Sequence, residues 1–381
     1  MKPPQNLVRW VGLMLIGWSL GALGADWPMS RGGPSLLGVA EGALAAKLSM
    51  LWSFSTGRPI KSSPAIYGKR VFFGSGDAKV YALDLADGKK AWDFSAGQPV
   101  ESSPLVLDGK VYIGSGDGML YALDAASGKE VWKYRTGEKI LGGPNWFKTT
   151  GTNGADAKER TLILVGSYDF KLHCVDAQTG QAVWSYESGN YINGSPAIAD
   201  GRTVFGGCDA VLHVISLADG KQEKEVEAGA YIAGSVALSE GRAYFGQFEN
   251  EFLCVDLKEG KQAWAFRDRN FPYFSSPAVT KDRVVFGGRD KMLHCVKKDD
   301  GSSLWSFATR GKVDSSPVVC GDKVVVGSDD GRVYLVALET GKELWSYEIG
   351  RPVGSSPAVA DGKVVIGADD GAIYCFGEGK K

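Results

Sequence analysis

Residues 102–134 read SSPLVLDGKVYIGSGDGMLYALDAASGKEVWKY, and this stretch decides the fold. It contains four short runs of strand-forming character, at Ser103–Leu107, Lys110–Gly114, Leu120–Asp124 and Glu130–Tyr134. The runs are separated by Asp108-Gly109, Asp117-Gly118 and Ser127-Gly128, and Asp-Gly pairs suit hairpin turns because both residues tolerate a positive φ. The stretch therefore predicts a unit of four short antiparallel strands.

This unit recurs along the chain, in three columns that keep step at spacings of 40, 40, 52, 40, 40, 41 and 40 residues. The tryptophan column is Trp52, Trp92, Trp132, Trp184, Trp264, Trp305 and Trp345, with Lys224 in the gap. The glycine column is Gly74, Gly114, Gly166, Gly206, Gly246, Gly287, Gly327 and Gly367. The Ser-Pro column starts at Ser63, Ser103, Ser195, Ser276, Ser316 and Ser356, with Gly143-Pro144 and Ser235-Val236 as variants. A period near 40 with four strands per unit is typical of propeller blades, so we expect an all-β, eight-bladed β-propeller.

The ends of the repeat indicate how the ring closes. The last unit has only three strands, Ser356–Val359, Lys363–Gly367 and Ala372–Phe376. Its missing fourth strand matches Leu51–Ser55, which precedes the first complete unit. We expect this N-terminal strand to complete the last blade of a propeller at residues 51–377, because closure removes an open sheet edge. Residues 25–50 then form an N-terminal extension.

The first 24 residues resemble a secretory signal peptide. Lys2 and Arg9 supply positive charge, and Val11–Leu23 is an apolar run too short to span a bilayer comfortably. Small residues at Ala22 and Gly24 predict cleavage near Gly24/Ala25, with an uncleaved anchor as the alternative. We expect a periplasmic or secreted protein that does not span the membrane after cleavage. No cysteine follows the run, so a lipoprotein is not indicated, and the formal net charge of −1 does not favour nucleic-acid binding.

The unit from Ser102-Ser103-Pro104 to Trp132 resembles the pyrroloquinoline-quinone (PQQ)-type propeller repeat, and the resemblance covers residues 51–376. It implies that the seven column tryptophans dock between adjacent blades and that the joint at Lys224 is weaker. The family includes quinoprotein alcohol dehydrogenases, which bind PQQ and calcium. It also includes the propeller lipoprotein of the outer-membrane β-barrel assembly machinery, which is similar in size and layout and binds partner proteins.

Residues that could carry chemistry follow the repeat, which favours structural roles. Cys174, Cys254, Cys295 and Cys375 share a column of small buried residues in different blades, too far apart for mutual disulfides. Pairing of Cys208 and Cys320 stays open.

His173, His213 and His294 fall in three blades and do not converge. One aspartate recurs in a turn of nearly every unit, which indicates turn chemistry more than calcium. A Cys-Cys pair, present in the quinoprotein alcohol dehydrogenases, is absent from this sequence.

Two departures from the repeat are candidate partner-binding features. The third unit is 12 residues longer, with a polar segment at Thr149–Asp156 that predicts a flexible loop beside Trp146 and Phe147. The column before Ser-Ser-Pro varies and should ring one mouth of the central channel. Its members include Lys61, Glu101, Asn193, Phe274 and Asp314, and Tyr191, Tyr231, Phe271 and Tyr273 should add aromatic contact surface nearby.

These observations predict an exported, non-catalytic scaffold that binds protein or peptide partners in the cell envelope, without a cofactor. Two alternatives stay open. One is a PQQ-dependent quinoprotein dehydrogenase, and the other is a carbohydrate- or polymer-binding module that uses the aromatic residues.

Overall fold

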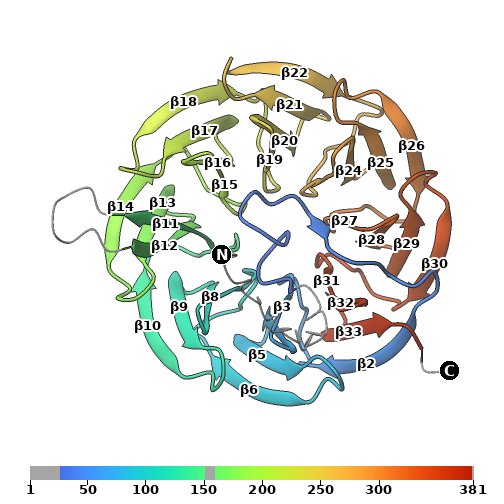
Figure 1. Ribbon diagram of the computed structural model, residues 1–381, viewed down its shortest axis with the longest axis horizontal. Coiled ribbons are helices and arrows are strands. Elements are labelled where there is room, and N and C mark those ends of the chain that lie inside the picture. The colour runs from blue at the N-terminus through green and yellow to red at the C-terminus, as the bar shows by residue number, and fades with distance from the viewer. Residues whose placement is uncertain (1–25, 151–158, 380–381) are drawn as a thin grey trace, which may run out of the picture.

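The computed structural model describes residues 26–150 and 159–379, and its strands form eight sheets arranged in a ring (Figure 1). Each sheet has four antiparallel strands, and the short parallel strand β1 joins one sheet as a fifth. The predicted eight-bladed β-propeller is therefore confirmed. The expected signal peptide at residues 1–24 and most of the expected loop in the third unit lie outside the described residues. Within the described ranges, no helix has the length and apolar character needed to cross a membrane.

The strands follow one another blade by blade around the ring. Blades one to four are β3 (Ala65–Tyr67), β4 (Arg70–Ser75), β5 (Lys79–Asp84), β6 (Lys90–Ser95); β7 (Leu105–Leu107), β8 (Lys110–Gly114), β9 (Met119–Asp124), β10 (Glu130–Arg135); β11 (Asn145–Thr150), β12 (Glu159–Gly166), β13 (Lys171–Asp176), β14 (Ala182–Glu187); and β15 (Ala197–Ala199), β16 (Arg202–Gly206), β17 (Val211–Ser216), β18 (Gln222–Glu227).

Blades five to eight are β19 (Ala237–Ser239), β20 (Arg242–Gly246), β21 (Phe252–Asp256), β22 (Lys261–Phe266); β23 (Ala278–Val279), β24 (Arg283–Gly287), β25 (Met292–Lys297), β26 (Ser303–Ala308); β27 (Val318–Cys320), β28 (Lys323–Ser328), β29 (Arg332–Ala337), β30 (Glu343–Glu348), with β1 (Val39–Ala40) beside β27; and β31 (Ala358–Ala360), β32 (Lys363–Gly367), β33 (Ala372–Gly377), β2 (Ser49–Ser55). The apolar core lies between neighbouring blades, as where Phe72 and Val80 of blade one pack with Val111 of blade two.

Blade two matches the sequence prediction closely. Asp108 and Gly109 have φ values of 49° and 73°, the positive pair that its first hairpin turn requires. The innermost strand begins at Leu105, later than the predicted Ser103. The reason is that Pro104 has no N–H and that the Ser102 hydroxyl donates to the carbonyl of Gly142 in the next blade.

The ring closes as the sequence predicts. Strand β2 pairs antiparallel with β33, and Trp52 lies opposite Cys375. At the channel, the Ser355 hydroxyl donates to the carbonyl of Ser62 at 3.0 Å, so blade eight is also joined to blade one along their innermost strands.

At six of the joints between blades, the tryptophan of one blade packs against a glycine of the next blade. The Trp92 Nε1 donates to the carbonyl of Ala125 in the next blade, and a Cβ on Gly128 would lie only 2.6 Å from the Trp92 ring. The corresponding hydrogen bond to the next blade is made by the Nε1 of Trp52, Trp132, Trp264 and Trp305. The buried Nε1 of Trp184 has no partner in the part of the chain that the structure describes. Trp345 packs edge-on against Phe376. Only glycine leaves room for the ring at these turns.

The extension before β2 closes one end of the central channel. Backbone carbonyls of residues 27–38 accept hydrogen bonds from the innermost strands of blades one, two, four, five, six and seven in turn, through Ile66, Val106, Ile198, Leu238, Val279 and Val319. In blade three, the Asn145 amide donates to the carbonyl of Pro34. Figure 1 shows this segment, in blue, crossing the centre of the ring.

The insertion in blade three differs in part from the prediction. Thr149 and Thr150 belong to β11, so the predicted loop begins as a strand, and β11 and β12 form a longer hairpin than in the other blades. The β-branched and aromatic residues of Asn145–Thr150 favour this extension of the pairing.

Candidate functional site at the mouth of the central channel

The open end of the channel, opposite the N-terminal segment, is surrounded by two sets of residues. The first set precedes each innermost strand, and the second occupies the turn between the second and third strands of each blade. Backbone hydrogen bonds join the two sets. The N–H groups of Tyr168, Phe248 and Arg289 in the turns donate to backbone carbonyls before the innermost strands, those of Lys139, Tyr231 and Pro272 respectively. Both sets therefore face the same side, which we call the mouth face.

Aromatic side chains gather on the mouth face in blades three to six. The rings of Tyr168 and Tyr191 stack with centroids 4.6 Å apart, and Phe170 lies 5.1 Å from Tyr191. Tyr231 and Phe274 flank Phe248 at 6.1 and 5.8 Å. Tyr191, Tyr231, Phe248 and Phe271 are exposed, Tyr231 by 51%. Exposed aromatic residues are characteristic of protein interfaces.

A concave pocket of about 530 Å³ lies within this aromatic region. It is lined by Glu138, Lys139, Tyr168, Asp169, Phe170 and Tyr191. The Lys139 ammonium lies 4.4 Å from the centroid of the Tyr168 ring, a cation–π distance. The pocket thus combines apolar ring faces with one cation, Lys139, and two carboxylates, Glu138 and Asp169.

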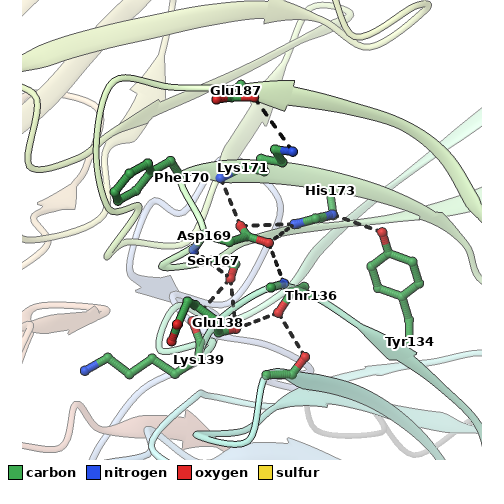
Figure 2. A network of polar contacts seen from close by, with 12 residues as sticks. Tyr134, Thr136, Glu138, Lys139, Ser167, Asp169, Phe170, Lys171, His173 and Glu187 are labelled. Atoms are coloured by element: carbon green, nitrogen blue, oxygen red, sulfur yellow. Dashed lines mark hydrogen bonds and ion pairs between the residues drawn. The ribbon is translucent and has the colours of Figure 1, made fainter.

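The turn under this pocket is fixed by Asp169, as Figure 2 shows. Its carboxylate accepts from the N–H groups of Gly137 and Lys171 and contacts the Nε2 of His173 at 3.0 Å, while the Nδ1 of His173 meets the Tyr134 hydroxyl. Burial alone would raise the pKa of Asp169, but the hydrogen bonds from His173 and Gly137 outweigh it and lower the pKa to about 2. Asp169 therefore remains a carboxylate and holds Phe170 in place.

The same arrangement recurs elsewhere, which explains the aspartate and histidine columns. An aspartate in the turn contacts a tyrosine or histidine four residues later in seven blades, at Asp77, Asp117, Asp169, Asp209, Asp290, Asp330 and Asp370. These aspartates also accept backbone N–H groups of their own turns. The structure thus assigns both columns a role in turn geometry.

One group of possible metal ligands occurs among the described residues. Asp268, Asp290 and His294 place one ligand atom each within 4.8 Å of one another. The pair His294–Asp290 repeats the turn pairs His173–Asp169 and His213–Asp209, so two of the three ligands have a structural reason to be there.

All six cysteines are free, and burial raises the pKa of Cys174 to about 12, which makes it an inert thiol.

The remaining half of the mouth face is charged. Lys61 pairs with Glu101 at 3.3 Å, and Asp314 accepts from Arg289 at 2.9 Å. The Arg289 guanidinium also lies 3.7 Å from the centroid of the Phe274 ring, where the charged and aromatic halves meet. In blade four, within the aromatic half, the Asn193 amide donates to the Sγ of Cys208.

Not every predicted residue lies on the mouth face. Tyr273 is fully buried, so the expectation that it adds exposed contact surface is wrong. It occupies the core position held by isoleucine or valine in the other blades and packs against Phe286. Phe147 is also buried, and Trp146 packs partly into the core near the closed end of the channel. Their place at the opposite end of the innermost strand separates them from the mouth face.

The sequence reasoning missed four residues of the mouth face, Tyr168, Phe170, Phe248 and Arg289. A signal was present, because the turn column reads Gly76, Gly116, Tyr168, Cys208, Phe248, Arg289, Asp329 and Asp369 and thus varies as strongly as the column before Ser-Ser-Pro.

Comparison with known proteins agrees with this architecture. The family profile described as outer membrane protein assembly factor BamB matches residues 43–265, 210–306 and 289–380, which together cover most of the chain. The chain belongs to this family. A search among curated proteins gives no match.

Solved structures resemble this BamB-family chain in fold. BamB from Moraxella catarrhalis has a TM-score of 0.70 at 18% identity and covers 88% of this chain and 98% of its own. A quinohemoprotein alcohol dehydrogenase from Comamonas testosteroni has a TM-score of 0.77 at 15% identity, with 93% and 81% covered. The computationally designed Ika8 protein reaches 0.74 at 19% identity, with 86% and 99% covered. Identities this low indicate a shared fold alone.

Proposed function

We propose that this chain is an exported, non-catalytic scaffold that binds protein or peptide partners in the cell envelope through the aromatic half of its mouth face. The name of the matching family, an outer membrane protein assembly factor, supports an envelope setting. The signal-like residues 1–24 support export to the periplasm or beyond.

One observation carries the proposal: of the six exposed aromatic side chains among the described residues, all but Tyr67 of blade one gather on one side of the mouth face. The eight blades are close copies, so the fold itself does not require Tyr191 and Tyr231 where other blades have proline or lysine. Nor does it require Phe248 where others have residues such as glycine or aspartate. Large exposed rings cost solubility and are retained where a partner covers them. The pocket beside Tyr191 would accept one apolar side chain of such a partner, with Lys139 and Glu138 at its rim.

The quinoprotein alternative finds less support. The cavity at the channel mouth has a volume of about 190 Å³, below the range of cofactor sites, and is lined by serine and glycine rather than by apolar walls. Both properties count against a planar tricyclic quinone as the occupant of this cavity. Isothermal calorimetry with PQQ, with and without calcium, tests this alternative directly, and micromolar binding with dye reduction by an alcohol would replace the scaffold proposal.

The scaffold proposal is tested by site-specific photo-crosslinking in the native envelope. A photoreactive phenylalanine analogue replaces Tyr191 or Tyr231, and in the control it replaces Val183, which is 39% exposed on the outer strand β14. We expect both mouth positions, and not Val183, to give one protein adduct of the same mass.

A second pair of variants checks that the aromatic surface is responsible. Phe248→Ala should reduce the adduct at position 231, because the two rings are neighbours. Leu304→Ala on the outer strand β26 is the matched control. Absence of adducts, or equal adducts at Val183, would contradict the proposal, and a carbohydrate-bearing adduct would favour the polymer-binding alternative.

A further inference from the structure

Arg31 lies at the floor of the channel cavity. It belongs to the N-terminal segment that closes the channel, and its side chain is only 4% exposed. Its guanidinium donates to the backbone carbonyls of Pro277, Ser316 and Pro317 at 2.7 to 3.2 Å. The residue has a φ of 61°, a conformation that costs energy for any side chain with a Cβ. The fold thus places an arginine at this point in spite of backbone strain.

The positive charge of Arg31 has no carboxylate partner among the described residues. Its bonds go to neutral carbonyls, and its Nε has no acceptor in the ranges that the structure describes. Burial lowers its pKa to about 9, which leaves the guanidinium charged at neutral pH. Of the other residues that line the cavity, Lys61 and Glu101 form an ion pair with each other, so the lining keeps a formal charge of +1. A buried charge without a counter-charge is unfavourable unless another ion compensates it.

Serine hydroxyl groups surround the cavity above Arg31. Each accepts an N–H from the preceding blade at 2.8 to 3.1 Å, and all of them line the cavity: Ser63, Ser103, Ser195, Ser235, Ser276, Ser316 and Ser356. A hydroxyl that accepts in this way still has one proton to donate. No described residue takes these protons, so seven donors line one polar space. The eighth position is Gly143, which has no hydroxyl.

We propose that the central channel is a binding site for a small, singly charged oxyanion of the carboxylate class, held by Arg31 and the serine hydroxyl ring. The charge of the lining, the seven hydroxyl protons without an acceptor among the described residues and the closed floor all favour an occupant that accepts hydrogen bonds and carries a negative charge. A volume of about 190 Å³ admits a small carboxylate with a few waters. This site is independent of the aromatic surface used in the proposed function.

The test measures acetate binding by the full protein. Acetate replaces chloride at constant ionic strength and pH, and the melting temperature is recorded together with the line width of ¹³C-labelled acetate. We expect a saturable rise in melting temperature and a broadened acetate signal, because a ligand that binds only the folded state stabilises it. Equal melting temperatures in both salts with an unbroadened signal would overturn the proposal and leave water as the occupant.

Three variants locate the site. Arg31→Met keeps the length of the side chain and should weaken acetate binding about tenfold or more, as loss of a charged hydrogen-bond donor does. Glu101→Gln removes the one carboxylate of the lining and should tighten binding a few-fold. Arg310→Met, an exposed arginine outside the cavity, is the control and should leave binding unchanged. Because Glu101→Gln changes binding in the opposite direction at an accessible position, the proposal remains testable even if Arg31→Met fails to fold. Unchanged or weaker binding by Glu101→Gln, or normal binding by Arg31→Met, would contradict it.

Discussion

The Nζ of Lys224 donates a hydrogen bond of 2.9 Å to the carbonyl of Leu257, the contact that tryptophan Nε1 makes at other joints between blades. Lys224 also bonds the carbonyl of Lys258, and its stem lies over Gly260 as the Trp92 ring lies over Gly128. At this joint, which the sequence predicts to be weaker than the others, lysine therefore supplies a polar substitute for the ring.

Lys224→Trp should stabilise the protein. Gly260 already leaves the space into which a ring fits at the other joints, and a docked tryptophan buries far more apolar area than a lysine stem. We expect a gain on the order of 1 kcal/mol, measured by chemical unfolding. Lys224→Ala is the comparison and should lose stability, since it removes both hydrogen bonds. An unchanged or lower stability of Lys224→Trp would show that the joint is adapted to lysine.

Gly128→Ala should destabilise the protein more than Gly109→Ala. Both glycines have a φ of 73°, so the backbone strain of the two substitutions is the same. A Cβ at Gly128 would lie 2.6 Å from the Trp92 ring, whereas nothing lies within 4 Å of one at Gly109. The difference between the two variants isolates overpacking, about 1–3 kcal/mol, and can be read from urea unfolding. Equal losses would mean that Trp92 moves aside freely.

Deletion of residues 51–56 should leave blade eight one strand short. The edge of β33 would then be unpaired, and such edges promote association. We expect dimers or aggregates in size-exclusion chromatography with light scattering. Addition of a peptide with the sequence of residues 49–56 should restore monomers by completing the sheet. A monomeric deletion variant with unchanged melting would contradict this account of closure.

Asp169→Asn should reduce stability at neutral pH and have little effect in acid. The pKa of Asp169 is lowered to about 2 in the folded protein, below its ordinary value near 3.8. A lowered carboxyl pKa adds stability above the unfolded value, and this stability is lost as the pH falls from about 4 to about 2. Melting temperatures of the two proteins should therefore differ at pH 6 and approach each other near pH 2. Asp200→Asn, in an exposed turn, is the control. A difference that persists unchanged near pH 2 would assign the loss to packing instead of charge.

The sequence by itself determined the number of blades, the strand order and the closure of the ring. These follow from local patterns, because Asp108-Gly109 specifies its own turn and the tryptophan and glycine columns keep step from Trp52 to Gly367. Variation within a column also pointed to Lys61 and Asn193 on the mouth face, and the aromatic residues near that column pointed to Tyr191. The sequence analysis wrongly placed Tyr273 on the surface, because an aromatic residue suits either a core or an exposed interface. Only its packing against Phe286 in the structure shows that it belongs to the core.

Only the tertiary structure decided what the channel contains. Arg31 precedes the repeat, so no column compares it with other residues, and its position depends on hydrogen bonds to residues more than 240 positions away. The serine ring is visible in the sequence as a repeated Ser-Pro, but its convergence on one cavity requires the closed ring. The stacking of Tyr168 on Tyr191 likewise joins two loops whose approach is set by the blade geometry. Local turn and strand preferences act within a few residues, whereas a site is made by side chains that the closed ring brings together from distant blades.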